Sequence, residues 1–273
     1  RLVLRVADLA PRQADLQEEV VGPPLKAAYD AAGQPTKAAE GFARSAGVSL
    51  AELRQVEHKG EARLQATRHV AGRPASDVLA EALPALIAGL PAARAMRWNA
   101  SGAAFSRPMR WILALHGSQV LPLVWAGLTA GRLTRGPRPR SQVLAVATAE
   151  DHGKLLFSQG IEVDPAARRE QIAAQVAALA AAKGGTVPQD AGLLAEVANL
   201  VEQPRALCGD FEPEYLDLPD PLLITVMKKH QRYFPVLKDG KLLNHFVTVA
   251  NANELAHPDV VRAGNEGVIR ARY

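Results

Sequence analysis

The feature that most constrains the fold is a pair of apolar runs, 233–237 and 243–250, on either side of Asp239-Gly240. An Asp-Gly pair between two such runs is typical of a tight two-residue β-hairpin turn. Pro235 lies inside the first run, and proline cannot donate a hydrogen bond to a neighbouring strand. We therefore expect an antiparallel sheet in the C-terminal part, with the strand that contains Pro235 at its edge.

Helix and strand signals alternate along the rest of the chain. Strands are expected at 1–7 and 204–209, and hairpins at 53–57 with 61–69 and at 111–115 with 119–125. Capping residues, among them Thr36, Ser76 and Asp164, predict helices at 37–46, 77–87, 148–158, 165–183, 190–201 and 220–230. A chain break is expected at 21–24 and an exposed loop at 127–141.

This mixture predicts an α+β fold with mixed or antiparallel sheets and packed helices. A boundary near Ser141 would separate an N-terminal α/β region, 1–140, from a helical segment with a β-hairpin region, 141–273. The chain opens at Arg1 without an initiator Met and ends at Tyr273, so we expect an excerpt of a longer protein.

Charge is distributed unevenly. Between Ala82 and Ala149 there are eight arginines and no Asp or Glu, a formal charge of +8 against +4 for the whole chain. All three tryptophans, Trp98, Trp111 and Trp125, lie in the same stretch. Guanidinium groups bind phosphate and stack on planar rings, which favours an RNA surface. Arginine as a compositional habit, or stacking of Arg on Trp inside the fold, would explain the same pattern.

Several chemical signatures are missing from the sequence. It contains no phosphate-binding glycine loop, no H-E-x-x-H or Cys/His cluster and no G-x-S-x-G elbow. The one cysteine, Cys208, can form neither an internal disulfide nor a zinc site by itself. No apolar stretch is long enough for a membrane helix. These absences argue against chemistry performed by this chain alone and against a metal site.

Four segments in collinear order carry a family resemblance. They are Pro35–Arg44; Met96-Arg97-Trp98 with Arg107-Pro108 and Trp111-Ile112; Leu193–Pro204; and Leu223–Val236, which continues through Val249–Asn251 to Gly264–Glu266 and Arg270–Arg272. Together they resemble the β subunit of the heterotetrameric bacterial glycyl-tRNA synthetase. One element departs from the family pattern: Pro137 and Pro139 stand where the family has His and an aromatic residue, so any role of those two side chains does not carry over.

The resemblance implies a division of labour. Glycine would be activated with ATP and Mg²⁺ on a separate α subunit, whereas the β subunit would recognise glycine tRNA and associate with α. This chain would then be a non-catalytic, cytoplasmic part of a ligase, with no cofactor of its own. Its fold would be similar to the B3/B4-type region of phenylalanyl-tRNA synthetase β chains. A hydrolytic editing module and a purely structural scaffold are the alternative functions.

The RNA-binding candidates fall into two groups. The first consists of arginines from the acid-free stretch, and the second lies where a predicted helix meets a strand. The candidates are Arg97, Arg107, Arg110, Arg132, Arg135, Arg138, Arg140, Lys228, Lys229, Arg232 and Tyr233. For the second group, cations that complement a helix C-terminus are an equally good interpretation. Trp98 and Trp111 are expected in the core, and turn or capping roles suffice for Asn251, Asn265 and Glu266.

Overall fold

The computed structural model describes residues 1–138, 141–252 and 257–272. The chain forms two compact units. The N-terminal unit comprises residues 2–110 with 121–129, and the C-terminal unit comprises Arg1, 111–120 and 130–273. The boundary expected near Ser141 stays a prediction. The expected α+β class is confirmed, because helices accompany antiparallel sheets throughout the described chain.

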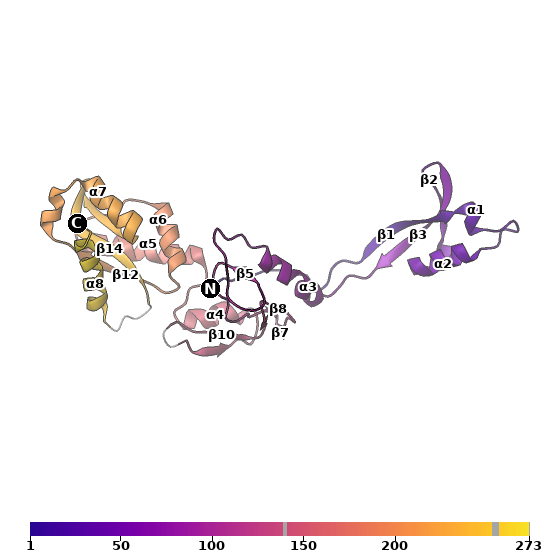
Figure 1. The fold of residues 1–273 in the computed structure, drawn as a ribbon, viewed down its shortest axis with the longest axis horizontal. Helices are drawn as coiled ribbons and strands as arrows, with labels where there is room; N and C mark the ends of the chain where they lie inside the picture. The colour runs from indigo at the N-terminus through magenta and orange to yellow at the C-terminus, as the bar shows by residue number, and fades with distance from the viewer. Residues whose placement is uncertain (139–140, 253–256, 273) are drawn as a thin grey trace. The chain divides into compact units, whose positions relative to one another are not determined.

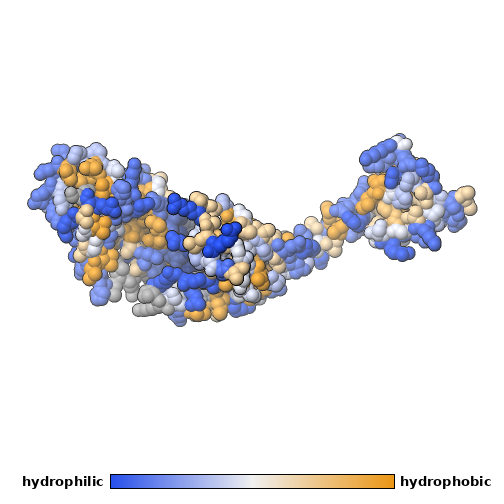
Figure 2. Space-filling model, viewed as in Figure 1, coloured by the Kyte–Doolittle hydropathy of each residue, from blue (hydrophilic) through white to orange (hydrophobic). Residues whose placement is uncertain are grey.

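The N-terminal unit contains a three-stranded antiparallel sheet in the order β1-β3-β2. Its strands are β1 (Leu16–Pro24), β2 (Arg54–His58) and β3 (Glu61–Val70), and helices α1 (Leu25–Ala28) and α2 (Lys37–Ala46) accompany it (Figure 1). Ala28, Ala39 and Leu64 form the buried centre between sheet and helices. On the face shown in Figure 2, hydrophilic residues lie at the top and bottom of this unit's sheet-and-helix part, with less polar residues between them.

Helix α2 begins and ends where the sequence predicts. The Thr36 hydroxyl accepts a hydrogen bond from the Ala38 amide at 3.3 Å, which satisfies an otherwise unpaired donor of the first turn. Gly47 ends the helix in the left-handed conformation, at φ 70°, where a side chain would be strained. The hairpin of β2 and β3 is confirmed as well, with His58 opposite Glu61. A 3-10 turn, η1 (Leu50–Glu52), follows Ser49.

Three predictions for the N-terminal unit are wrong. Residues 1–7 form no strand; Leu2 is 69% exposed, and its alternating segment has no neighbouring strand to pair with. The chain break expected at 21–24 is not found, because these residues belong to β1. The register of β1 shifts between Val21 and Pro24, as in a β-bulge. The helix expected at 77–87 is present as α3 (Ala75–Ala88), but Ser76 does not cap it. Helix α3 begins after Pro74, and the Ser76 hydroxyl donates to Asp77.

Short hairpins occupy the middle of the chain. In the N-terminal unit, β4 (Met96–Arg97) pairs with β5 (Ala104–Phe105), and β8 (Val124–Trp125) pairs with β9 (Leu128–Thr129). In the C-terminal unit, β6 (Leu115–His116) pairs with β7 (Gln119–Val120), and β10 (Leu133–Arg135) pairs with β11 (Val143–Ala145). The hairpin expected across 111–125 is therefore shorter than predicted.

The loop expected at 127–141 is the other correction in this region. Its described part contains β9 and β10, and Thr134 is only 3% exposed. Alternation in β10 buries Thr134 and exposes Leu133 and Arg135, so pairing with β11 gives the segment one buried face.

The C-terminal unit is built around the predicted hairpin. Its sheet has the order β12-β14-β13, with strands β12 (Pro204–Asp210), β13 (Phe234–Lys238) and β14 (Lys241–Asn251). Asp239 and Gly240 have φ values of 49° and 80°, the positive values that a tight turn between twisted strands requires. Strand β13, which contains Pro235, lies at the edge as expected.

Helices contribute to two hydrophobic clusters that also involve this sheet (Figure 1). Helices α5 (Pro165–Ala182) and α6 (Ala191–Leu200) share one cluster with Val236 and Val247. The other cluster contains Phe246 together with residues of α7 (Asp220–Thr225), the π-helical η3 (Val226–Gln231) and α8 (Pro258–Arg270). Helix α4 (Asp151–Ser158) and the 3-10 turn η2 (Pro213–Asp217) complete the unit. None of the helices in the described ranges is long and apolar enough to span a membrane.

Gly209→Ala tests the packing of this sheet. A Cβ at position 209 would meet the Phe246 ring at 2.5 Å, and that ring is fully buried and stacked on Tyr233. We expect a loss of about 1–3 kcal/mol in the free energy of unfolding, measured by urea denaturation. The control is Gly264→Ala in α8, which has open space around it and should gain up to about 1 kcal/mol from helix propensity. Equal midpoints for the two variants would contradict this packing.

Candidate nucleic-acid interface

Six arginines of the acid-free stretch have no carboxylate partner among the described residues. Where the structure describes them, Arg94, Arg97, Arg107, Arg132, Arg135 and Arg138 are exposed and make no ion pair with Asp or Glu. Arg110 is exposed as well, and Arg140 lies outside the described residues. These arginines are divided between the two units, so each group is described by itself.

In the C-terminal unit the arginines lie in β10 and shortly before and after it. The Arg132 guanidinium donates to the carbonyl oxygens of Ser118 at 3.0 Å and Ala147 at 3.2 Å, and so ties two loops together. The Arg135 guanidinium lies over the Trp111 ring, 5.8 Å from its centroid. Such cation–π contacts leave the edge of the guanidinium able to donate hydrogen bonds. Arg135 and Arg138 are therefore better placed than Arg132 to receive a phosphate.

In the N-terminal unit the arginines flank an aromatic cluster. Trp125 is 9% exposed and contacts the rings of Trp98 and Phe105, with centroid distances of 6.2 and 5.8 Å. The Arg97 Nε donates to the carbonyl oxygen of Gly102 at 3.0 Å. The tryptophan cluster thus supports the local fold, and Arg97 and Arg107 extend from the exposed positions beside it.

The second group of candidates lies at a widened helical turn. Helix α7 ends at Thr225, and the predicted helix continues as η3, which ends at Arg232 in the left-handed conformation, φ 59°. Lys228 is paired with Asp190, and the Arg232 Nε donates to Glu196 at 2.8 Å. Lys229 is exposed and has no partner within the described part of the chain. Of these three cations, only Lys229 keeps its charge uncompensated.

Asp190 has a second role at the start of α6. Its carboxylate accepts a hydrogen bond from the Leu193 amide at 2.9 Å, as an N-cap does. This hydrogen bond, together with the Lys228 ammonium, holds the pKa of Asp190 below its usual value. The carboxylate therefore stays charged at neutral pH. The sequence predicts the cap but gives no signal for the pairing with Lys228, which depends on how α6 and η3 are placed in the fold.

Tyr233 is a correction to the candidate set. Its ring is 3% exposed and stacks on Phe246 with 4.6 Å between centroids, so it cannot stack on a base. Its hydroxyl donates to the Asn265 side chain at 2.6 Å, and burial raises the pKa of Tyr233. The Asn265 amide donates in turn to the Val261 carbonyl at 2.7 Å. Tyr233 thus connects the sheet to α8.

The other polar residues of the family-like segments have similar structural roles. The Asn251 carboxamide oxygen accepts hydrogen bonds from the Glu202 and Gln203 amides. Glu266 accepts one from the Asp210 amide at 3.0 Å. These residues therefore have structural roles, but through hydrogen bonds between distant segments and not through the turn or capping contacts that the sequence suggests.

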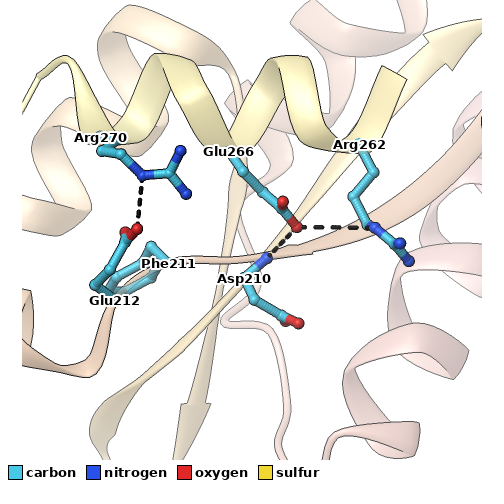
Figure 3. A pocket seen from close by; sticks show the side chains of 6 residues that line it. All are labelled: Asp210, Phe211, Glu212, Arg262, Glu266 and Arg270. Atoms are coloured by element: carbon cyan, nitrogen blue, oxygen red, sulfur yellow. Dashed lines mark hydrogen bonds and ion pairs between the residues drawn. The ribbon is translucent and has the colours of Figure 1, made fainter. Parts of the chain in front are cut away.

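An open hollow of about 470 Å³ lies between α8 and the end of β12. Figure 3 shows Arg262, Glu266 and Arg270 projecting from one side of α8 towards Asp210, Phe211 and Glu212. The Arg270 Nε donates to Glu212 at 2.6 Å, and the Arg262 Nε lies 3.8 Å from Glu266. Its two arginines pair with glutamates, so the hollow joins α8 to the sheet, and its three carboxylates outnumber the arginines, which does not suit a phosphate.

Comparisons with known proteins agree on one family. Residues 1–273 match the family model described as glycyl-tRNA synthetase beta subunit. The chain is 48% identical to the glycine–tRNA ligase beta subunit of Desulforamulus reducens, over 100% of this chain and 39% of that protein. It is 40% identical to the Bacillus subtilis subunit, over 100% of this chain and 40% of that protein. A chloroplastic/mitochondrial glycine–tRNA ligase of Arabidopsis thaliana is 42% identical, over 100% of this chain and 26% of that protein. The chain therefore spans about two-fifths of the length of these bacterial relatives.

Tyr233→Phe separates a core role from a binding role. Because the ring is buried, removal of the hydroxyl should lower the free energy of unfolding by about 0.5–1.5 kcal/mol, since the hydrogen bond to Asn265 can no longer form. RNA affinity, measured by filter binding, should not change. If stability is unchanged and RNA binding is weaker, Tyr233 is an RNA-binding residue and not a core residue.

Proposed function

The chain belongs to the glycyl-tRNA synthetase β-subunit family, and on that premise we propose that it contributes tRNA recognition and α-subunit association to the ATP-dependent charging of tRNA with glycine. Glycine activation with ATP and Mg²⁺ is assigned to the α subunit, and this chain is assigned a non-catalytic part. The assembly is proposed to work in the cytoplasm. We also propose that the fold is similar to the B3/B4-type region of phenylalanyl-tRNA synthetase β chains.

The observation that carries the RNA part is the uncompensated charge of the acid-free stretch. A guanidinium that lacks a carboxylate partner within the described residues, such as that of Arg135 or Arg138, can pair with a phosphate without first giving up an ion pair. Arg97 and Arg107 provide the same chemistry in the N-terminal unit. Arg132 is assigned a positioning role, since its donors already hold carbonyl oxygens.

The test uses the longer β polypeptide that carries this sequence, with its α subunit, and glycine tRNA in a salt series. In Arg135→Ala/Arg138→Ala the affinity should fall at low salt. The slope of log K against log salt should shrink by about 0.7–0.9 for each phosphate that the variant can no longer neutralise. Filter binding measures both quantities.

The matched control removes the same charge elsewhere in the C-terminal unit. Arg205 and Arg272 are exposed and have no side-chain partner in the described ranges, so Arg205→Ala/Arg272→Ala changes only the net charge. If the control lowers the salt slope by the same amount, the net charge of the chain, and not the position of Arg135 and Arg138, accounts for tRNA binding. If tRNA affinity stays constant while α association weakens, the scaffold function replaces the proposed one. Hydrolysis of mischarged tRNA by the β polypeptide would favour the editing module.

A further inference from the structure

A groove of about 340 Å³ lies between α6 and the α7–η3 segment. Its walls carry Asp190 and Glu196 from α6, and Thr225, Lys228 and Lys229 from the facing segment, with Leu193 and Ile224 at its apolar part. Figure 1 shows α6 and α7 near each other in the C-terminal unit. The groove thus brings together Lys228 and Lys229, which the sequence proposes for RNA, and two carboxylates that the sequence does not connect with them, and Arg232 joins it through its ion pair with Glu196.

Each carboxylate holds one of the cations. Lys228 and Asp190 form one ion pair, and their side chains are 32% and 26% exposed. The Arg232 Nε and a Glu196 oxygen are 2.8 Å apart, with side chains 40% and 48% exposed. Ion pairs that are partly exposed, as these are, contribute little to stability because water still competes for both partners. Their exchange for another anion therefore requires little energy.

The Arg232 guanidinium has an anchor besides its carboxylate. A terminal nitrogen of the Arg232 guanidinium donates to the Lys229 carbonyl oxygen at 2.8 Å, and the left-handed backbone at Arg232 fixes the end of η3. Lys229 has no ion-pair partner in the part of the chain that the structure describes. It gives the groove one uncompensated positive charge with which a polyanion can make its first contact.

We propose that Asp190 and Glu196 are built-in competitors of tRNA phosphates for Lys228 and Arg232, so that RNA binds at this groove by ion-pair exchange. The inference rests on the proposed tRNA-binding function and names how that function is restrained. Lys229 makes the first contact with a tRNA phosphate, and further phosphates then displace the two carboxylates from Lys228 and Arg232. Removal of negative charge from α6 therefore strengthens RNA binding.

Two isosteric substitutions test this directly. Asp190→Asn keeps the side-chain oxygen that caps α6, and Glu196→Gln keeps an acceptor for the Arg232 guanidinium. In filter binding with glycine tRNA and the αβ assembly, each change should raise the affinity about two- to fivefold at low salt. The salt slope should also become steeper, because a displaced carboxylate recruits a cation from solution and offsets part of the counterion release. Lys229→Ala should lower both the affinity and the slope.

The control removes two carboxylates that are paired elsewhere. Glu18→Gln/Glu81→Gln breaks the exposed pairs with Arg68 and Arg73 and changes the net charge by the same amount as the double groove variant. Ion-pair exchange predicts that tRNA affinity rises more in Asp190→Asn/Glu196→Gln than in this control. If the wild type binds tRNA and the two double variants behave alike, the exchange is overturned and the proposed function stands. If the wild type does not bind tRNA, both are overturned. A change in α association alone would assign the groove to the subunit interface and overturn the exchange.

Discussion

A positive charge that the fold does not compensate is the constraint on which this account depends. Between Ala82 and Ala149 the chain supplies guanidinium groups without a single nearby carboxylate in sequence. In the structure their neighbours are carbonyl oxygens and an aromatic ring, as for Arg132 and Arg135. Carbonyl oxygens orient a guanidinium but do not neutralise it. The counter-charge must come from solution or from a bound anion, and membership of a tRNA ligase family makes tRNA the proposed anion.

Other cations of the C-terminal unit show the opposite arrangement. Lys228 and Arg232 at η3 are paired with Asp190 and Glu196, and the α8 arginines Arg262 and Arg270 are paired with Glu266 and Glu212. On α8 these pairs support the docking of the helix, together with the buried hydrogen bond between Tyr233 and Asn265. At η3 the pairs are partly exposed, and Asp190, Glu196 and Lys228 line a groove, so these ion pairs are available for exchange. The same residue types therefore have two roles. On α8 the ion pairs hold the helix in place, whereas at η3 they are proposed to compete with RNA for the cations.

Local signals in the sequence account for a large part of the fold. The Asp239-Gly240 turn, the Thr36 cap and the edge position of Pro235 follow from short-range stereochemistry, and all are found as predicted. The segment 1–7 has a strand-like pattern but forms no strand, because a strand also requires a neighbour. The segment 127–141 has loop-like composition, yet pairing with β11 gives Thr134 a buried face. For the candidate interface, the sequence identifies the cations. It cannot identify which of them meet a carboxylate, because Asp190 and Glu196 reach Lys228 and Arg232 only through tertiary structure.

The central claim is that tRNA supplies the missing counter-charge of the acid-free stretch. Arginine-specific dicarbonyl modification of the αβ assembly, read by mass spectrometry with and without glycine tRNA, measures it residue by residue. The account predicts that tRNA protects Arg97, Arg107, Arg135 and Arg138, whereas Arg205 and Arg272 stay reactive. Unchanged modification of those four arginines under saturating tRNA would contradict it.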